Sequence, residues 1–208
     1  MRINIKPILV ALILITLMAC DSKDNDSNPN DFNSPTFQKK YLELGHKVSE
    51  ESFNAIRLNL MTAMAANGVS GAVEFCKTAA YPITDSLSEL YSAKIRRTSI
   101  KYRNPLNKPD ESELEILNHF GSLHDSGTLI KDSIIKISDK EIWYVRPIYA
   151  QGLCQNCHGS VGNTVSTDNY DVIKKLYPED KAVDYKSGDL RGMWSIKLLV
   201  DDEDIMKD

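Results

Sequence analysis

The stretch that decides the fold is TLIKDSIIKISDKEIWYVRPIY, residues 128–149. It is rich in β-branched and aromatic residues, and the polar tripeptide SDK at 138–140 divides it into two halves. Such side chains favour extended backbone, and a short polar interruption between two apolar runs favours a tight turn. We therefore predict strands over 128–137 and 141–149, joined as an antiparallel hairpin.

The residues upstream of this hairpin have helical periodicity. Over 37–66 apolar residues recur every three or four positions with one phase slip, which predicts a long amphipathic helix that stops at Asn67 and Gly68. A second helix is expected over 69–80, where Pro82 interrupts it. The remaining predicted elements are a strand over 95–102, a loop over 104–109, a helix over 110–124 capped by Asp110 or Ser112, a short helix over 169–177 and a last strand over 192–200. Helices followed by a small antiparallel sheet with helical inserts predict an α+β domain.

Composition agrees with one folded domain. The 208 residues are 42% hydrophobic and 26% charged, which is the balance of a globular protein. The net charge of −4 argues against a general nucleic-acid binder, which would carry a basic excess. The sequence contains no Gly-rich phosphate loop, H-E-x-x-H or G-x-S-x-G motif, so nucleotide hydrolysis, zinc proteolysis and serine hydrolysis have no positive support.

The N-terminal residues predict export and a lipid anchor. Arg2 and Lys6 precede an apolar run over 8–19, which is shorter than the about 20 residues that cross a bilayer as a helix. The run ends in LMAC at Cys20, which resembles the lipobox of bacterial lipoproteins. We expect a signal peptide over 1–19 and a lipidated Cys20 that holds the protein on the extracytoplasmic side of a membrane. An uncleaved anchor with an incidental Cys is the alternative.

The segment after Cys20 is expected to be a tether. Residues 21–36, DSKDNDSNPNDFNSPT, are acidic and rich in Ser and Asn, with a single aromatic residue. Such a segment cannot bury enough apolar surface to fold by itself. We therefore divide the chain into the signal peptide, a lipidated Cys and disordered acidic linker over 20–36, and a folded domain over 37–208.

A C-x-x-C-H motif, formed by Cys154, Cys157 and His158, follows the hairpin. This is the attachment motif of c-type haem. Two thiols at this spacing can bond to the two vinyl-derived carbons on one porphyrin edge, and the next imidazole then reaches the iron. The motif predicts one covalently bound haem c. A thiol redox pair and half of a zinc site are the alternatives, but no second pair of Cys or His supplies the other zinc ligands.

The residues alone leave the second axial ligand of the iron open. If Cys20 is lipidated and Cys154 and Cys157 hold haem, Cys76 is an odd thiol in an exported protein. A buried thiol that packs as a small hydrophobe is the alternative interpretation. Other side chains that ligate haem iron are His46, His119, His124, Met61, Met64 and Met193.

A basic segment precedes the motif. Residues 91–108 carry six Lys or Arg and no acid, a pattern typical of a solvated surface. Alternatively, Arg96, Arg97 or Arg103 pairs with the haem propionates, because a guanidinium matches a carboxylate bidentately. The aromatic residues before the motif, which either wall the porphyrin or pack in the core, are Trp143, Tyr144 and Tyr149.

Several sequence blocks carry a resemblance to one known family. In chain order they are AVEFCK at 72–77, RRTS at 96–99 with RNP at 103–105, YVRPI at 144–148 leading into CQNCHG at 154–159, LYPED at 176–180 and GDLRG at 188–192. Their order and spacing resemble the c-type haem proteins with a PAS-like fold that were long catalogued as a domain of unknown function. The resemblance covers nearly all of the domain. This sequence departs from the family pattern at Met193 and Trp194, where smaller residues are expected.

The resemblance implies a PAS-like antiparallel sheet flanked by helices, with His158 as the proximal ligand and Cys76 as the distal ligand of the haem iron. Thiolate ligation neutralises the ferric centre, so a low reduction potential is expected. On reduction the thiolate is expected to detach easily, which opens a coordination position for a small ligand.

These expectations favour a redox or small-ligand sensor that acts on a signalling protein; this step is analogy with other PAS folds. A simple electron-transfer cytochrome with its redox partner is the first alternative. A thiol-disulfide oxidoreductase that uses the C-x-x-C pair is the second. We expect a haem-binding protein rather than an enzyme, with membrane contact through the lipid anchor and no nucleic-acid partner.

Overall fold

The computed structural model describes residues 31–201. The predicted signal peptide over 1–19, Cys20 and most of the linker lie outside the described residues. The helices are α1 (Pro35–Thr78), α2 (Ala80–Leu90), α3 (Glu111–Asp125), α4 (Gln155–His158) and α5 (Thr167–Leu176). The strands are β1 (Ala93–Thr98), β2 (Ser133–Ser138), β3 (Glu141–Tyr149) and β4 (Leu190–Leu199). Within 31–201, no helix is both long and apolar enough to cross a membrane.

The strands form one antiparallel sheet in the order β1-β4-β3-β2. The predicted hairpin is confirmed as β2 and β3, and β3 has the predicted bounds. β2 begins at Ser133, later than predicted, because only the stretch from Ser133 onward pairs with β3. The fold class is α+β, with an antiparallel sheet flanked by helices and a long N-terminal helix, as predicted.

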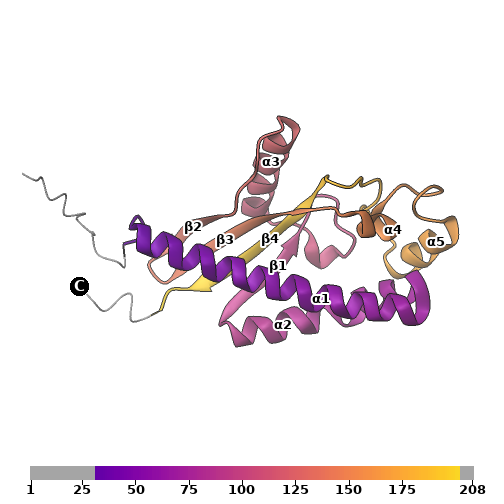
Figure 1. Ribbon diagram of the computed structural model, residues 1–208, viewed down its shortest axis with the longest axis horizontal. Helices are drawn as coiled ribbons and strands as arrows, with labels where there is room; N and C mark the ends of the chain where they lie inside the picture. The colour runs from indigo at the N-terminus through magenta and orange to yellow at the C-terminus, as the bar shows by residue number, and fades with distance from the viewer. Residues whose placement is uncertain (1–30, 202–208) are drawn as a thin grey trace, which may run out of the picture.

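The sheet separates two apolar clusters. Tyr144 and Ile196 belong to the cluster that includes Tyr41 of α1, whereas Val145 and Met193 pack with Leu117 of α3. This alternation follows from the strand period of two, which sends neighbouring side chains to opposite faces. Figure 1 shows α1 running the length of the sheet and α3 projecting away from it.

Local sequence explains how α1 meets the sheet. Ser34 caps the helix by accepting a hydrogen bond from Phe37 N at 3.1 Å, and Pro35 occupies the first turn. A Cβ atom on Gly45 would lie 2.3 Å from the ring of Tyr144, so glycine is the residue that allows this close approach. α1 therefore begins slightly before residue 37 and lies directly against β3.

The predicted stop at 67–68 is confirmed as a break within α1. Asn67 and Gly68 have non-helical dihedral angles, and Gly68 adopts φ 61° and ψ −154°, which favours glycine. The residues after the break form a separate helical segment over 69–78 that carries Cys76. The predicted end of this segment before Pro82 is confirmed, because α1 ends at Thr78 and a separate helix, α2, begins at Ala80. Pro82 has no N–H to donate to Thr78 O, so the first helix cannot continue through it, whereas Pro82 is tolerated in the first turn of α2.

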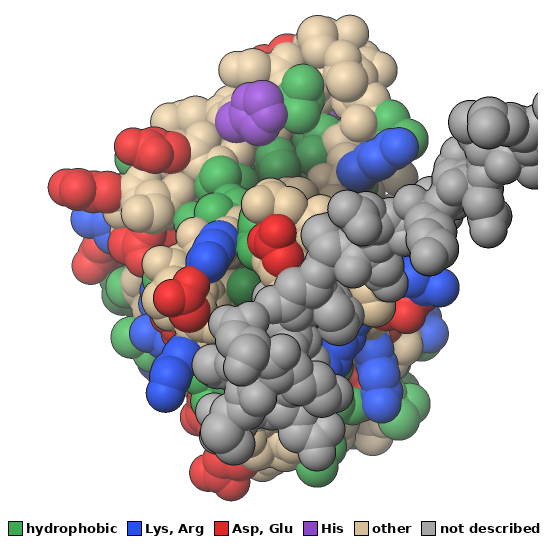
Figure 2. All heavy atoms as spheres, turned by 90° about the vertical axis from the view of Figure 1, so that its left-hand side faces the viewer, with side chains coloured by type: hydrophobic (Ala, Val, Ile, Leu, Met, Phe, Trp, Pro, Cys, Tyr) green, Lys and Arg blue, Asp and Glu red, His purple; other side chains and the backbone are tan. Residues whose placement is uncertain are grey.

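The surface charges are mixed. Figure 2 views the molecule from the end where α1 begins and shows acidic and basic side chains interspersed on that face. This distribution agrees with the net charge of −4 and with the absence of a basic excess in the sequence.

Candidate functional site

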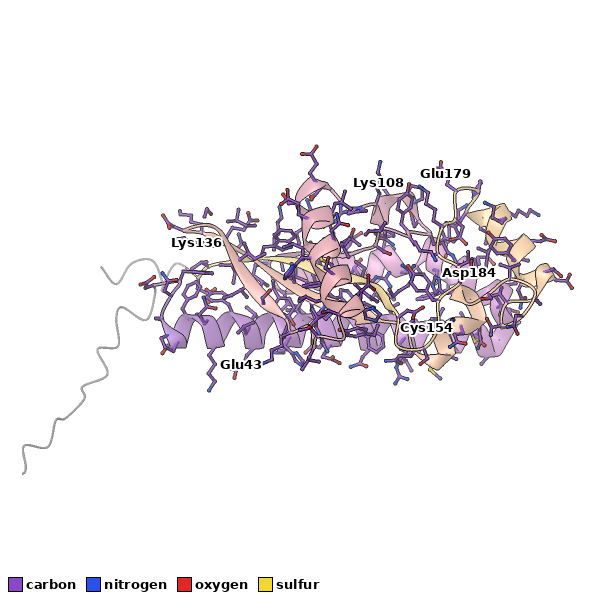
Figure 3. All side chains as sticks on the ribbon, turned by 90° about the horizontal axis from the view of Figure 1, so that it is seen from above. Glu43, Lys108, Lys136, Cys154, Glu179 and Asp184 are labelled. Atoms are coloured by element: carbon purple, nitrogen blue, oxygen red, sulfur yellow. The ribbon has the colours of Figure 1, made fainter. Side chains whose placement is uncertain are left out.

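The C-x-x-C-H motif lies just beyond the end of β3. Cys154 ends a 3-10 turn over Gly152–Cys154, and the motif continues into the short helix α4. Cys154 and Cys157 are both free thiols. Figure 3 shows Cys154 toward the same end of the molecule as Glu179 and Asp184, opposite Glu43 and Lys136. We call this the motif end.

Backbone hydrogen bonds hold the motif to the loop over 177–189. Tyr185 N donates to His158 O at 2.9 Å, and Gly188 N donates to Ala150 O at 2.8 Å. A Cβ atom on Gly159 would lie 1.9 Å from Thr164 Oγ1, so glycine is needed where the chain leaves the motif. The loop over 177–189 is therefore hydrogen-bonded to the chain just before the motif and at the last residue of the motif.

His158 has the form of a metal-ligating imidazole. Its Nδ1 lies 2.8 Å from Ala182 O, and because a carbonyl only accepts, Nδ1 carries the proton. Burial lowers the pKa of His158 well below its usual value, and the nearby Arg191 and Arg103 guanidiniums lower it further. The ring is therefore neutral, with the lone pair on Nε2. A backbone acceptor on the other ring nitrogen is a common way to orient an axial His.

Arg103 fixes the position of the motif. Its Nε and Nη2 atoms donate to the two carboxylate oxygens of Asp180 at 3.0 and 3.1 Å. The same Nη2 donates to Cys157 O at 2.6 Å and to Ala182 O at 3.2 Å. The side chains of both members of this ion pair are buried. The buried pair thus joins the motif to the loop whose Ala182 carbonyl orients His158.

Cys76 lies in the electrostatic neighbourhood of the motif. Burial raises the pKa of the Cys76 thiol, while Arg97 and Arg103 act in the opposite direction. Burial also raises the pKa of Cys157, and the charges of Cys76 and Cys154 add to that effect. The helical segment after the α1 break also packs on the chain that follows the motif: Val73 packs with Val165 and Tyr177, and Lys77 Nζ donates to Leu176 O at 3.1 Å.

The three arginines singled out in the sequence have different surroundings. Arg96 donates to Glu113 at 3.2 Å and to Lys108 O at 3.1 Å, and Arg103 is bound to Asp180. Arg97, which lies 5.8 Å from the Trp194 ring centroid, forms no ion pair among residues 31–201. Burial lowers the pKa of the Arg97 guanidinium, opposed by Cys76 and two nearby tyrosines, Tyr81 and Tyr177. Arg97 is therefore the one of the three with its charge free for an added anion.

The other candidate ligands are spread over the molecule. His46, beside Asp132 at 3.5 Å, and His119 are exposed. Met61 is 44% exposed, and Met64 is half-buried in the same part of α1. His124 ends α3 with its Nε2 3.2 Å from Gly188 O.

The residues that depart from the family pattern are core residues. Met193 is fully buried on the α3 face of the sheet, and Trp194 is buried on the α1 face. Trp143 and Tyr144 also pack in the two cores, where they bond to Ser195 and Asp132 respectively. Ordinary core packing therefore explains Trp143 and Tyr144, while Tyr149 is 37% exposed near the ring of His124.

Several residues of the site were not singled out from the sequence. They are Asp180, Ala182, Tyr185 and Arg191. Asp180 and Arg191 lie within the blocks LYPED and GDLRG, so the resemblance contained a signal for them. Nothing local marks Ala182 or Tyr185, because their roles depend on a backbone carbonyl and on a ring that long-range folding brings beside His158.

The donor set fits a haem c group. Cys154 and Cys157 supply two reduced thiols at the attachment spacing, His158 presents a free Nε2, and Cys76 supplies a third thiol from another segment. Among residues 31–201 no three His, Cys, Asp or Glu side chains gather as a site for a bare metal ion.

Comparison with known proteins supports the family resemblance. The sequence model of the Tll0287-like family matches residues 18–198. The crystal structure of the cyanobacterial heme-protein Tll0287 matches with a TM-score of 0.53 and 22% sequence identity, over 76% of this chain and 94% of that chain. At this identity the structural match shows a shared fold. The curated proteins contain no match. Because the family model spans most of its length, the chain belongs to the Tll0287-like family.

Proposed function

We propose that this chain is an extracytoplasmic haem c protein. Cys154 and Cys157 attach the porphyrin covalently, while His158 and Cys76 are the axial ligands of its iron. The observation that carries this proposal is the packing of the Cys76 segment on the chain that follows the C-x-x-C-H motif, where Val73 packs with Val165 and Tyr177. Membership of a family that includes the cyanobacterial heme-protein Tll0287 supports it.

The chain's own residues prepare this site before any cofactor arrives. Ala182 O holds the His158 ring in one tautomer, and Arg103 joins the motif backbone to Asp180. When bound, haem c supplies one-electron redox chemistry and an iron that can bind small ligands. Of the three arginines singled out in the sequence, Arg97 is the one best placed to pair with a propionate, since Arg96 and Arg103 already have carboxylate partners.

A sensory role is the form of this function that the structure favours. Burial, the larger effect, raises the pKa of the Cys76 thiol, and the charges of Arg97 and Arg103 oppose it only in part, so this side chain favours the neutral thiol when no iron holds it. Cys76 is carried by a helical segment over 69–78 that the Asn67–Gly68 break separates from the rest of α1. A ligand on such a segment can leave the iron without disturbing the sheet. We therefore propose a redox or small-ligand sensor of low reduction potential that acts on a separate signalling protein.

The test of the axial ligands compares the wild-type protein with Cys76→Ser, both produced in a host that assembles c-type cytochromes. We expect the ferric wild type to show the absorption and electron-resonance signature of a low-spin thiolate-ligated haem. Cys76→Ser should lose that signature. Met64→Leu alters a half-buried alternative ligand in α1 and should leave the signature unchanged.

An unchanged signature in Cys76→Ser would move the distal ligand to another side chain. Since that variant has to fold for the comparison to be valid, its thermal unfolding is measured beside that of the wild type. A haem attached to a Cys76→Ser protein of ordinary stability, with an altered spectrum, supports the proposal.

The sensory role is tested on the reduced protein. We expect dithionite reduction to change the ligation of the iron and carbon monoxide to alter the ferrous spectrum. A ferrous spectrum that keeps both ligands and does not respond to carbon monoxide would favour electron transfer instead. A colourless protein with titratable Cys154 and Cys157 thiols would favour the thiol-disulfide oxidoreductase.

The proposed location rests on the N-terminal sequence alone. We propose that the signal peptide over 1–19 is removed and that acylated Cys20 anchors the domain. Palmitate labelling and membrane fractionation test this anchor. We expect both label and membrane association in the wild type and neither in Cys20→Ser, whereas a Cys20→Ser protein that stays in the membrane would indicate an uncleaved anchor.

A further inference from the structure

A cavity of about 420 Å³ lies between α3 and the ends of β1 and β4. Its lining includes Lys101, Leu117, His124, Tyr185, Leu190 and Arg191. A volume of this size suits a small organic molecule. Neither Cys76 nor His158 lines the cavity, so the proposed iron ligands do not account for it.

On one wall of this cavity, two cationic side chains lie against the same aromatic ring. Lys101 Nζ lies 4.6 Å and the Arg191 guanidinium carbon 5.0 Å from the Tyr185 ring centroid. Both side chains are half-buried, and among residues 31–201 neither forms an ion pair with an acid. Partly desolvated cations without a counter-charge favour an anionic partner.

Hydrogen bonds fix the Arg191 side chain in place. Its Nη1 donates to Ser99 Oγ at 2.8 Å and to Lys101 O at 3.1 Å, while Lys101 Nζ donates to Val183 O. These bonds use one of the two terminal nitrogens of the guanidinium, and a further hydrogen bond joins the group to Tyr185. Of its five N–H groups, those that remain can donate to a carboxylate. The cationic wall is therefore preorganised.

Acidic residues also line the cavity, and their positions limit what it can bind. Asp125 is exposed and lies beside His124 at 3.7 Å, and Asp189 accepts a hydrogen bond from Lys186 N at 2.7 Å. Asp184 is exposed as well. Asp125 and Asp184 are thus solvated, and the half-buried Asp189 is already engaged by a backbone N–H, while Leu117 and Leu190 add apolar lining to the cavity.

We propose that this cavity is a carboxylate-binding site, in which Arg191 and Lys101 hold the carboxylate and Leu117 and Leu190 contact an apolar body. Two sources share this chemistry: a haem propionate, which rests on the proposed function, and a free small organic acid, which does not. Tyr185 connects the site to the motif, because its ring lies edge-on to His158 with centroids 6.4 Å apart.

Sodium butyrate is the probe, because it joins a carboxylate to a short apolar chain. Calorimetric titration is performed on the haem-loaded protein and on the same chain produced without haem, with butanol and sodium chloride as controls. We expect butyrate to bind at least one form. Arg191→Gln and Lys101→Met should each weaken that binding at least about tenfold, as expected for a lost charge-assisted hydrogen bond.

Lys94→Gln is the matched control, since it removes an exposed cation from β1, the strand that precedes Lys101, and should leave the affinity unchanged. Binding to both forms identifies a free organic acid as the ligand, and binding to the haem-free form alone identifies a propionate. Binding no tighter than that of butanol in both forms overturns the proposal. Wild-type affinity in both Arg191→Gln and Lys101→Met also overturns it. A failure of the proposed function is recognised separately, as a mature protein without haem.

Discussion

The two ends of the molecule differ in how many of their cationic side chains are paired with an acid. Near the hairpin, Arg146 donates to Ser49 Oγ at 3.0 Å and pairs with Glu50 at 2.6 Å, and Tyr144 donates to Asp132 at 2.8 Å. At the motif end, one buried ion pair joins Arg103 to Asp180. Three further half-buried cations at that end, Arg97, Lys101 and Arg191, have no acidic partner among residues 31–201.

The paired charges near the hairpin stabilise the fold, whereas the cations at the motif end are candidates for binding a ligand. The polar groups at the hairpin end satisfy one another and join α1 to the sheet, so they need nothing further. The cations at the motif end carry charge that the described part of the protein leaves uncompensated, and a partly buried charge of this kind is costly unless a ligand balances it. This is the basis of our proposal that an anionic group binds at the motif end.

The largest expected effect comes from breaking the buried pair at the motif end. Arg103→Met leaves the buried Asp180 carboxylate without its cation, so we expect a loss of about 3–5 kcal/mol in unfolding free energy. Arg146→Met, at the hairpin end, removes a more exposed pair and should cost no more than about 1 kcal/mol. Urea unfolding of the two variants measures the difference, and equal losses would contradict the contrast.

A smaller effect is expected at the break in α1. Gly68→Ala places a side chain at φ 61° and ψ −154°, a conformation costly for any residue except glycine, so we expect a loss of about 1–3 kcal/mol. No heavy atom lies within 4 Å of the added Cβ, so the loss would come from backbone strain alone. Gly121→Ala, in α3, is the control, because its added Cβ also meets no neighbour within 4 Å. A Gly68→Ala protein as stable as wild type would show that the break is not needed.

The next largest effect on stability is expected from removing the hydroxyl group of Tyr144. Burial and the hydrogen bond to Asp132 raise the pKa of its hydroxyl above the ordinary value. Because the folded-state pKa is the higher one, the neutral phenol stabilises the fold fully below about pH 10, and this stabilisation is lost as the pH rises through the folded-state pKa. Tyr144→Phe should cost about 1 kcal/mol near neutral pH.

The stability difference between wild type and Tyr144→Phe should therefore shrink as the solution becomes strongly alkaline. Urea unfolding across the alkaline range measures it. A difference that grows with pH would mean that the ionised tyrosine, rather than the neutral one, is stabilised by its surroundings.

The smallest effect is expected for Arg97 in the chain produced without haem. Arg97→Met removes a cation that has no acidic partner, and the lost contact with Trp194 is offset by relief of desolvation. We expect the unfolding free energy to change by less than about 1 kcal/mol. A loss of several kcal/mol would show that Arg97 is a structural residue and that its charge is already balanced.

Features with a local cause were predictable from the sequence. Alternating apolar residues and the SDK turn located the hairpin, and Asp110 or Ser112 was expected to cap α3. The structure shows Asp110 accepting from Glu113 N and Glu113 accepting from Asp110 N, a reciprocal capping box. The stop at Asn67 and Gly68 was also readable, since glycine there permits a backbone that other residues avoid.

Features that depend on distant contacts were not predictable in the same way. The interruption before Pro82 was predicted correctly, but the pattern did not reveal that a second helix, α2, begins at Ala80 with Pro82 in its first turn. The residues alone did not distinguish Cys76 from His124 or Met64 as a ligand, and only the family resemblance selected it. The pairing of Arg103 with Asp180 required the folded chain.

The most direct test of the central claim is the intact mass of the mature protein, measured under denaturing conditions after production in a host that assembles c-type cytochromes. We predict the polypeptide plus one haem, with a peptide containing Cys154 and Cys157 that retains the porphyrin through two thioether bonds. A polypeptide mass without haem, with those two cysteines free or joined in a disulfide, would contradict the account.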